Sequence, residues 1–316
     1  MILSADQVWS ILACPRCREG LRRYAHGAVC TNTRCAYSTA PFPIVDSTPV
    51  LVDFEQSILD RDRAETSRWR SPISRRRMRT PVRLLRSALF GKNSVASGNE
   101  RRFLELLRDH RERSVCVIIG GATPGSGMSL LYEAPSVEVL GLDIYRSPLV
   151  TIVGDAHQMP IKSGSVDGVW IQAVLEHVLD PWQVVSEIHR VLGRGGLVYA
   201  ETPFMQQVHE GPYDFTRFTH SGHRWLFRNF EELSSGIVAG VGTQMLWAVE
   251  YFLRALLRSE MAGKVAKVVA SPLRLFDRVC GEAFQLQSAS AFFFLGRRSE
   301  SSLPIGAMRD YYRGPD

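Results

Sequence analysis

Residues 115–201 alternate short β-rich runs with helical runs, and this alternation constrains the fold more than any other feature of the sequence. Strands that alternate with helices form a parallel sheet with right-handed crossover connections. Ligands of such sheets bind just beyond the carboxyl ends of the strands. The runs that predict strands are 114–121, which ends in a glycine turn, 137–142, 166–171 and 197–200, with a shorter run near 150–153.

Small and acidic residues follow these strands directly. Asp143 lies 23 residues after Gly120, close to the ~20-residue interval at which an acidic side chain accepts hydrogen bonds from ribose hydroxyls. A glycine turn that opens a helix lets backbone N–H groups approach a ligand, because glycine has no Cβ. Asp155 is a second acidic position, twelve residues further along. The pattern indicates a site for a ribose-containing ligand at this edge of the sheet.

Two further segments narrow the interpretation. Residues 167–178 read Asp-Gly-Val-Trp-Ile-Gln-Ala-Val-Leu-Glu-His-Val, and residues 190–203 read Arg-Val-Leu-Gly-Arg-Gly-Gly-Leu-Val-Tyr-Ala-Glu-Thr-Pro. With them, residues 114–235 resemble the class I S-adenosylmethionine-dependent methyltransferases, most closely the methyltransferase type 11 group. The resemblance implies a Rossmann-like α/β fold with a seven-stranded, mostly parallel sheet, and S-adenosylmethionine as the cofactor.

The resemblance also implies which residues hold the cofactor. In that family the glycine loop holds the methionine moiety, the acid after the second strand holds the ribose, and an Asp-Ala pair lies by the adenine. The family usually has an acid two residues before the first loop glycine, where this sequence has Ile118, and its loop is shorter than the turn at 120–127. The residues carried over are Gly120, Gly121, Gly125, Gly127, Asp143, Ile144, Asp155, Ala156 and Gln172.

Four of the six cysteines form two close pairs near the N-terminus. Cys14 and Cys17 make the first pair, and Cys30 and Cys35 make the second. Two such pairs about a dozen residues apart place four thiolates at the corners of a tetrahedron, which predicts structural zinc. Disulfides or four unrelated thiols are the alternatives. A four-cysteine site leaves no coordination position for a substrate, so its role would be structural or docking.

The sequence predicts several modules. The segments that flank the cysteines, 11–15 and 42–51, resemble the small zinc-ribbon activator subunit of tRNA and rRNA methyltransferases. Residues 61–92 hold eleven Lys or Arg against two acids, a balance of +9 that exceeds the net +6 of the whole chain. Such a block attracts phosphates of nucleic acid or an anionic membrane, and a solvated linker is the alternative. The expected modules are a zinc ribbon at 1–56, a basic linker at 57–98, a methyltransferase domain at 99–298 with a helical insertion at 241–286, and a loosely ordered tail at 299–316.

Polar and aromatic side chains crowd residues 201–220, just beyond a predicted strand. Their 213–219 core resembles a run in methyltransferases of glycan and secondary-metabolite pathways. His209 or Asp214 could take a proton from an acceptor, and Arg217 could hold a carboxylate or phosphate. An Asp214–Arg217 pair that only fixes the loop is the alternative. His177 is a further candidate base, with a scaffold role as its alternative.

These features predict an S-adenosylmethionine-dependent methyltransferase that acts on a small-molecule or glycan acceptor by in-line displacement, which depends mainly on positioning. An rRNA or tRNA methyltransferase, and a non-catalytic zinc-ribbon adaptor with a degenerate cofactor fold, are the alternatives. No apolar run reaches the ~18 residues of a membrane-spanning helix, and the N-terminus lacks a signal-peptide pattern. We therefore expect a cytoplasmic protein. Its helical insertion would cover the substrate cleft, form a homodimer face or lie on a membrane surface.

Overall fold

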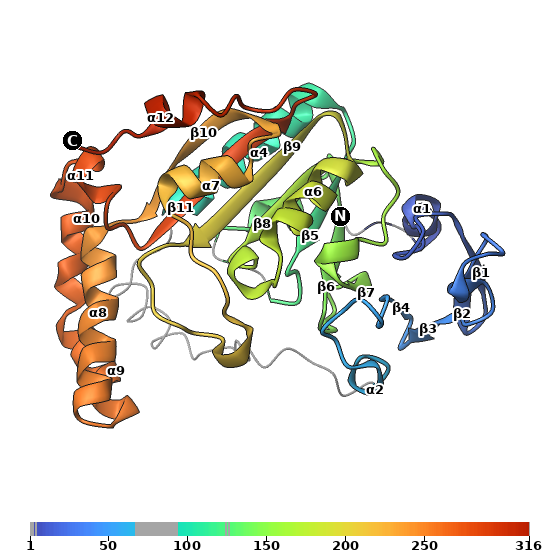
Figure 1. The fold of residues 1–316 in the computed structure, drawn as a ribbon, viewed down its shortest axis with the longest axis horizontal. Helices are drawn as coiled ribbons and strands as arrows, with labels where there is room; N and C mark the ends of the chain where they lie inside the picture. The colour runs from blue at the N-terminus through green and yellow to red at the C-terminus, as the bar shows by residue number, and fades with distance from the viewer. Residues whose placement is uncertain (1–2, 4, 67–93, 124, 126, 316) are drawn as a thin grey trace.

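The computed structural model describes residues 3, 5–66, 94–123, 125 and 127–315. Within these residues one sheet of eleven strands runs through the molecule (Figure 1). Its strands lie in the order β1-β2-β3-β4-β7-β6-β5-β8-β9-β11-β10. In chain order they are β1 (Leu21–Tyr24), β2 (Gly27–Cys30), β3 (Phe42–Val45), β4 (Thr48–Leu51), β5 (Ser114–Ile119), β6 (Val137–Asp143), β7 (Ile152–Gly154), β8 (Val166–Gln172), β9 (Leu192–Pro203), β10 (Phe230–Ala239) and β11 (Ala291–Arg298).

The seven strands from β7 to β10 form the Rossmann-like part of the sheet. Strands β7, β6, β5, β8 and β9 are parallel to one another, whereas β11 is antiparallel to both of its neighbours, β9 and β10. At the centre, Val117 of β5 pairs with Leu140 of β6 and with Val169 of β8. The predicted α/β fold with a seven-stranded, mostly parallel sheet is confirmed.

Alternate residues of the central strands contribute their side chains to two apolar layers, because successive side chains of a strand point to opposite faces. Ile118 belongs to one layer and its neighbour Ile119 to the other. Helix α4 (Ser94–His110) covers the first layer, where Phe103 meets the ring of Trp170 edge-on at 5.4 Å. Helix α6 (Pro181–Val191) covers the second layer and buries Ile188 in it. Two shorter helices, α5 (Ser129–Glu133) and α7 (His220–Leu226), complete the layers.

The N-terminal module does not form a separate sheet. After α1 (Ala5–Ile11), its strands β1 to β4 and the 3₁₀ turn η1 (Ala36–Ser38) follow, and β4 lies parallel beside β7. Val50 pairs there with Val153, and Leu51 with Gly154. The chain leaves β4 at the edge where the predicted ligand site lies. The basic segment begins with short helix α2 (Arg61–Ala64), and its residues from 67 onward lie outside the described residues.

Helices α8 (Val241–Leu256) and α9 (Glu260–Val269) lie side by side between β10 and β11 in sequence, at one end of the molecule (Figure 1). They are followed by η5 (Ser271–Leu275), α10 (Phe276–Val279) and α11 (Glu282–Gln285). None of the described helices is both long enough and apolar enough to cross a membrane. The group exposes many large apolar side chains, among them Phe252, Leu256, Met261, Val269, Val279 and Phe284.

The C-terminal segment differs from the loosely ordered tail expected at 299–316. Helix α12 (Ala307–Tyr311) packs on α7, and the ring of Tyr311 stacks on the ring of His220 with centroids 5.0 Å apart. The Tyr311 hydroxyl also lies 2.9 Å from the hydroxyl of Ser235 on β10. The aromatic stacking and this hydrogen bond fix a segment whose short, polar sequence gives no helical periodicity.

Candidate functional site

The four N-terminal cysteines converge as the zinc prediction requires. Their sulfur atoms all lie within 4.8 Å of one another, with Cys14 and Cys35 3.8 Å apart and Cys17 and Cys30 3.3 Å apart. A tetrahedron with ~2.3 Å zinc–sulfur bonds has edges of about 3.8 Å. All four are free cysteines in the structure, so each sulfur is available to a metal ion. The donor set therefore fits a structural zinc ion.

The turn after β5 can accept only glycine at two of its positions. Gly120 has φ +78°, and a Cβ there would lie 2.4 Å from Val174 Cγ2. Gly127 has φ +82°, and a Cβ there would lie 2.9 Å from the backbone of Ala96. Positive φ and such close approach both exclude a side chain. The bare backbone of Gly120 forms part of the wall of a pocket at the carboxyl ends of the strands.

Asp143, the last residue of β6, lines the same pocket with a fixed carboxylate. The backbone N–H of Ala122 donates to one of its oxygens at 2.8 Å, and that of Tyr145 donates to the other at 2.9 Å. Burial raises the pKa of Asp143, and the backbone hydrogen bonds oppose this rise. Each oxygen keeps a further lone pair, so a ribose hydroxyl can still donate to it.

Asp155, just after β7, is held from two directions. The hydroxyl of Ser57 donates to one oxygen, and His157 donates to the other from its backbone N–H at 2.9 Å and from Nδ1 at 2.6 Å. The Nδ1 atom of His157 carries the proton, because Nε2 accepts a hydrogen bond from the N–H of Asp180 at 3.1 Å. Burial raises the pKa of Asp155, but the hydrogen bonds from His157 and Ser57 lower it overall.

The pocket joins these groups to residues that the sequence did not indicate. Ile58 and Leu59, which follow the N-terminal module, form one side of it, and Ile144 and Ala156 also line it. Sequence analysis missed Ile58 and Leu59, because their position depends on the pairing of β4 with β7. The predicted cofactor residues in the wall are Gly120, Asp143, Ile144, Asp155 and Ala156, whereas Gly121, Gly125, Gly127 and Gln172 lie outside it.

Gln172 instead belongs to a buried polar chain beside the glycine turn. Its amide donates to Glu201 at 2.8 Å, and the hydroxyl of Tyr199 donates to the same carboxylate. Asn99 of α4 donates to the Tyr199 hydroxyl at 3.1 Å. Burial raises the pKa of Glu201, and the two hydrogen bonds oppose that rise. A Cβ on Gly125 would lie 2.1 Å from Gln172 Oε1, so Gln172 packs directly against the glycine turn.

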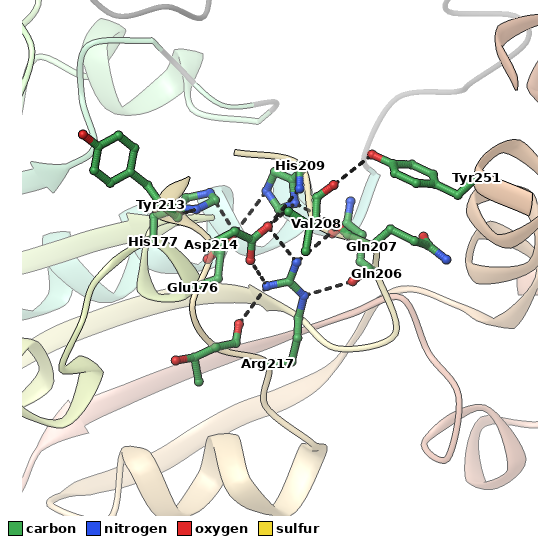
Figure 2. Close-up of polar contacts among 11 residues, drawn as sticks. Glu176, His177, Gln206, Gln207, Val208, His209, Tyr213, Asp214, Arg217 and Tyr251 are labelled. Atoms are coloured by element: carbon green, nitrogen blue, oxygen red, sulfur yellow. Dashed lines mark hydrogen bonds and ion pairs between the residues drawn. The ribbon is translucent and has the colours of Figure 1, made fainter. Parts of the chain in front are cut away.

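A second cluster forms where residues 204–219 meet the segment that follows β8, and Figure 2 shows its side chains. Arg217 binds Asp214 through both of its terminal nitrogens, one of them at 2.9 Å, and also donates to the carbonyl of Gln206 at 3.0 Å. Burial opposes ionisation of Asp214, but the hydrogen bonds from Arg217 and from the N–H of His209 lower its pKa to about 2. These contacts favour the alternative in which Asp214 and Arg217 fix the loop.

Glu176, His177 and His209 form the remainder of this region, and we call them the histidine cluster. Glu176 Oε1 lies 3.6 Å from His177 Nε2 and 3.8 Å from His209 Nε2. Glu176 is 1% exposed, and burial raises its pKa to about 8. Burial also lowers the pKa of His177. His177 and Tyr213 line the pocket, so the histidine cluster adjoins it.

Residues 121–200 match a protein-family model described as a methyltransferase domain, which confirms the resemblance to methyltransferases. The chain is 34% identical over 98 residues to an uncharacterized 37.1 kDa protein from a Streptomyces fradiae transposon, covering 26% of this chain and 28% of that protein. It is 26% identical over 166 residues to a malonyl-(acyl-carrier protein) O-methyltransferase from Laribacter hongkongensis. This match covers 45% of this chain and 55% of that protein. Among solved structures, a phosphoethanolamine N-methyltransferase 2 from Haemonchus contortus is 15% identical, with a TM-score of 0.42. This match covers 69% of this chain and 56% of that structure's chain. The chain thus spans about a quarter of the first relative and about half of the second.

Proposed function

We propose that this chain, which carries a methyltransferase domain at residues 121–200, transfers a methyl group from S-adenosylmethionine to a small-molecule or glycan-type acceptor. The observation that carries the proposal is the pocket at the carboxyl ends of β5, β6 and β7. It combines a glycine backbone at Gly120 with two fixed carboxylates, Asp143 and Asp155. Ligands of doubly wound sheets bind at this edge.

The pocket residues fit the parts of the cofactor. Asp143 would accept hydrogen bonds from the ribose hydroxyls. The apolar side chains of Ile58, Leu59 and Ala156 would pack on the adenine. When bound, S-adenosylmethionine supplies an electrophilic methyl group on a sulfonium. The protein's part is then mainly to align the acceptor with that methyl group and to exclude water.

The acceptor would approach from the side of His177 and Tyr213. The loop at 204–219 covers this side, and Phe215 N donates to the carbonyl of Glu176 at 2.8 Å, which anchors the loop. Helix α8 supports the loop from outside, because the Tyr251 hydroxyl donates to the carbonyl of Val208 at 3.0 Å. The helical insertion therefore adjoins the acceptor side of the site.

The exposed apolar side chains of the insertion support peripheral contact with a membrane. Phe252 is 65% exposed, Val269 75% and Phe284 69%. Exposed Lys264 lies on α9, and exposed Arg258 lies in the turn between α8 and α9. Apolar side chains flanked by cations are typical of helices that lie on anionic lipid. The alternative is that a second copy of this chain packs on this surface to form a homodimer.

The zinc ion would hold the N-terminal module together and so hold the wall of the pocket. Four cysteines complete a tetrahedral site, which leaves no position for a substrate. A cytoplasmic location stays a prediction. It is supported by four thiols gathered for a metal, since reducing compartments favour metal binding over disulfides.

Labelling distinguishes the acceptor classes. The protein is incubated with methyl-labelled S-adenosylmethionine and a cell extract, which is then separated into small molecules and lipids, RNA, and protein. Label in the small-molecule or lipid fraction supports the proposal. Label in RNA supports the rRNA or tRNA methyltransferase alternative, and label in no fraction supports the non-catalytic adaptor. A pocket-deficient variant, Asp143→Ala, serves as the background.

A further inference from the structure

Three atoms that can each donate an electron pair meet in the histidine cluster. Glu176 Oε1 faces His177 Nε2 at 3.6 Å and His209 Nε2 at 3.8 Å, and all three lie within 4.8 Å of one another. Both carboxylate oxygens of Glu176 are buried, and no other described residue donates a hydrogen bond to either. Burying a carboxylate without a hydrogen-bond donor costs free energy unless a positively charged group binds it.

The hydrogen bonds of the two imidazoles show which nitrogen carries the proton. His177 Nδ1 lies 2.6 Å from the carbonyl oxygen of Tyr213, and a carbonyl only accepts, so Nδ1 is the donor. His209 Nδ1 likewise faces only acceptors, the carbonyl of Gln207 at 3.3 Å and the carboxylate of Asp214 at 3.4 Å. In the neutral imidazoles, both Nε2 atoms therefore carry a lone pair, and they lie 3.6 Å and 3.8 Å from Glu176 Oε1 (Figure 2).

Direct hydrogen bonds do not account for this arrangement. The separations of 3.6 Å and 3.8 Å exceed the usual ~2.7–3.2 Å between a nitrogen and an oxygen that share a hydrogen bond, whichever atom carries the proton. Bonds of ~2.0–2.1 Å from one ion to nitrogen and oxygen place tetrahedral ligands about 3.4 Å apart. The observed separations of 3.6 Å and 3.8 Å from Glu176 Oε1 lie slightly above that spacing.

We propose that Glu176, His177 and His209 hold a divalent first-row transition-metal ion beside the cofactor pocket. Two imidazoles and one carboxylate suit zinc, iron, manganese or cobalt better than magnesium or calcium, which prefer oxygen ligands. The partners of both Nδ1 atoms are those that metal-binding histidines have, a backbone carbonyl and a carboxylate. Arg217, bound to Asp214, fixes the second of these partners in turn.

This ion differs from the zinc of the four cysteines, because three protein ligands leave coordination positions open. An acceptor hydroxyl bound there would lie next to the pocket that His177 and Tyr213 line. The ion would lower the pKa of that hydroxyl, so its proton passes to water without a protein base. The acceptor oxygen then bonds to the methyl carbon as the carbon–sulfur bond breaks, and sulfur takes the electron pair. This step rests on the proposed function and assigns the acceptor to the hydroxyl class.

Zinc titration into tag-free protein whose four-cysteine site is already filled tests the proposal. We expect one further zinc ion to bind per chain. In His209→Gln the affinity for this second ion should fall at least about tenfold. His26→Gln, which replaces an exposed histidine on the turn between β1 and β2, is the matched control and should bind like the wild type. Metal analysis after dialysis gives the stoichiometry independently of heat signals.

The outcomes separate this inference from the proposed function. A second ion that binds wild type and His209→Gln equally, or no second ion, would overturn the metal site. S-adenosylmethionine is titrated into the same samples, because His209 does not line the pocket. Retained cofactor binding in His209→Gln shows that the variant is folded. Metal binding without cofactor binding in the wild type would instead contradict the proposed function and leave the metal site standing.

Discussion

The hydroxyl of Ser57 donates a hydrogen bond to the carboxylate of Asp155, across 98 positions of the chain. This contact joins the segment that leaves the N-terminal module to the part of the pocket that Asp155 lines. Ile58 and Leu59 follow Ser57 directly and line the pocket. The segment that directly follows the cysteine module therefore contributes to the wall of the pocket.

We expect Ser57→Ala to weaken S-adenosylmethionine binding by about threefold to tenfold. The lost hydrogen bond is worth about 0.5–1.5 kcal/mol, and Asp155 would be less firmly oriented. Calorimetric titration measures the change. Ser10→Ala, an exposed serine of the same module, is the control and should leave the affinity unaltered. Equal affinities for all three proteins would show that the contact does not shape the pocket.

Loss of the four-cysteine zinc should weaken the cofactor pocket as well as the module. Cys30→Ser removes one of the four ligands, so the protein should hold one zinc fewer and unfold at a lower temperature. Cofactor affinity should fall in parallel, since β4 positions residues 57–59 beside β7. Cys280→Ser, outside the cluster, is the control. Unchanged cofactor affinity in a zinc-deficient Cys30→Ser protein would show that the zinc site does not support the pocket.

Tyr199→Phe should destabilise the fold by about 1–3 kcal/mol, because it leaves the buried carboxylate of Glu201 with one donor fewer. Urea unfolding of the variant and the wild type gives the difference in the free energy of unfolding. Tyr24→Phe, which changes a 43% exposed tyrosine, is the control. A difference within the error of the control would mean that Glu201 is satisfied without the Tyr199 hydroxyl.

His223 should make stability fall in acid. It is 2% exposed, and burial, together with nearby His220, lowers its pKa to about 3. The folded state therefore binds fewer protons than the unfolded chain, whose histidines titrate near about 6.5. The stability linked to this group is complete above that pH and is lost as the pH falls toward 3.

The variant His223→Leu isolates this effect. Between pH 6.5 and pH 5 the wild type should lose about 2 kcal/mol more unfolding free energy than His223→Leu, at about 1.4 kcal/mol per pH unit. Urea unfolding at several pH values measures both proteins. His26→Gln controls for the loss of an exposed histidine. Parallel pH profiles for the wild type and His223→Leu would contradict the lowered pKa.

Asp214→Asn should weaken the second metal ion roughly 10–100-fold, because partners of metal-binding histidines orient the ring and raise its basicity. Asp214 would thus act as a positioning residue through His209. Zinc titration of the variant measures the change, with Asp109→Asn on the exposed end of α4 as the control. An affinity for zinc equal to that of the wild type in Asp214→Asn would show that Asp214 does not position His209.

Local patterns explain what the sequence could predict. A strand, a glycine turn and an acidic residue follow one another within short distances along the chain, so Gly120, Asp143 and Asp155 could be placed at one edge of the sheet. The four cysteines are equally local, since their pairs lie about a dozen residues apart. The strand alternation then determined the α/β fold, because parallel strands need crossover helices.

Non-local contacts explain what it could not predict. Ser57 meets Asp155 only because β4 adds to the edge of the sheet beside β7. His209 meets Glu176 only because the loop at 204–219 folds back over β8, and no periodic pattern encodes that path. Glu176 directly precedes His177 in the sequence, and only its burial without a hydrogen bond from another residue distinguishes it.

The most direct test of this account is a calorimetric titration of S-adenosylmethionine into the wild type and Asp143→Ala. Asp109→Ala, at an exposed position, controls for the loss of a carboxylate. We predict that the wild type and Asp109→Ala bind one cofactor per chain and that Asp143→Ala loses this binding. Absence of binding in folded, zinc-loaded wild type, or equal binding in Asp143→Ala, would contradict the assignment of the pocket.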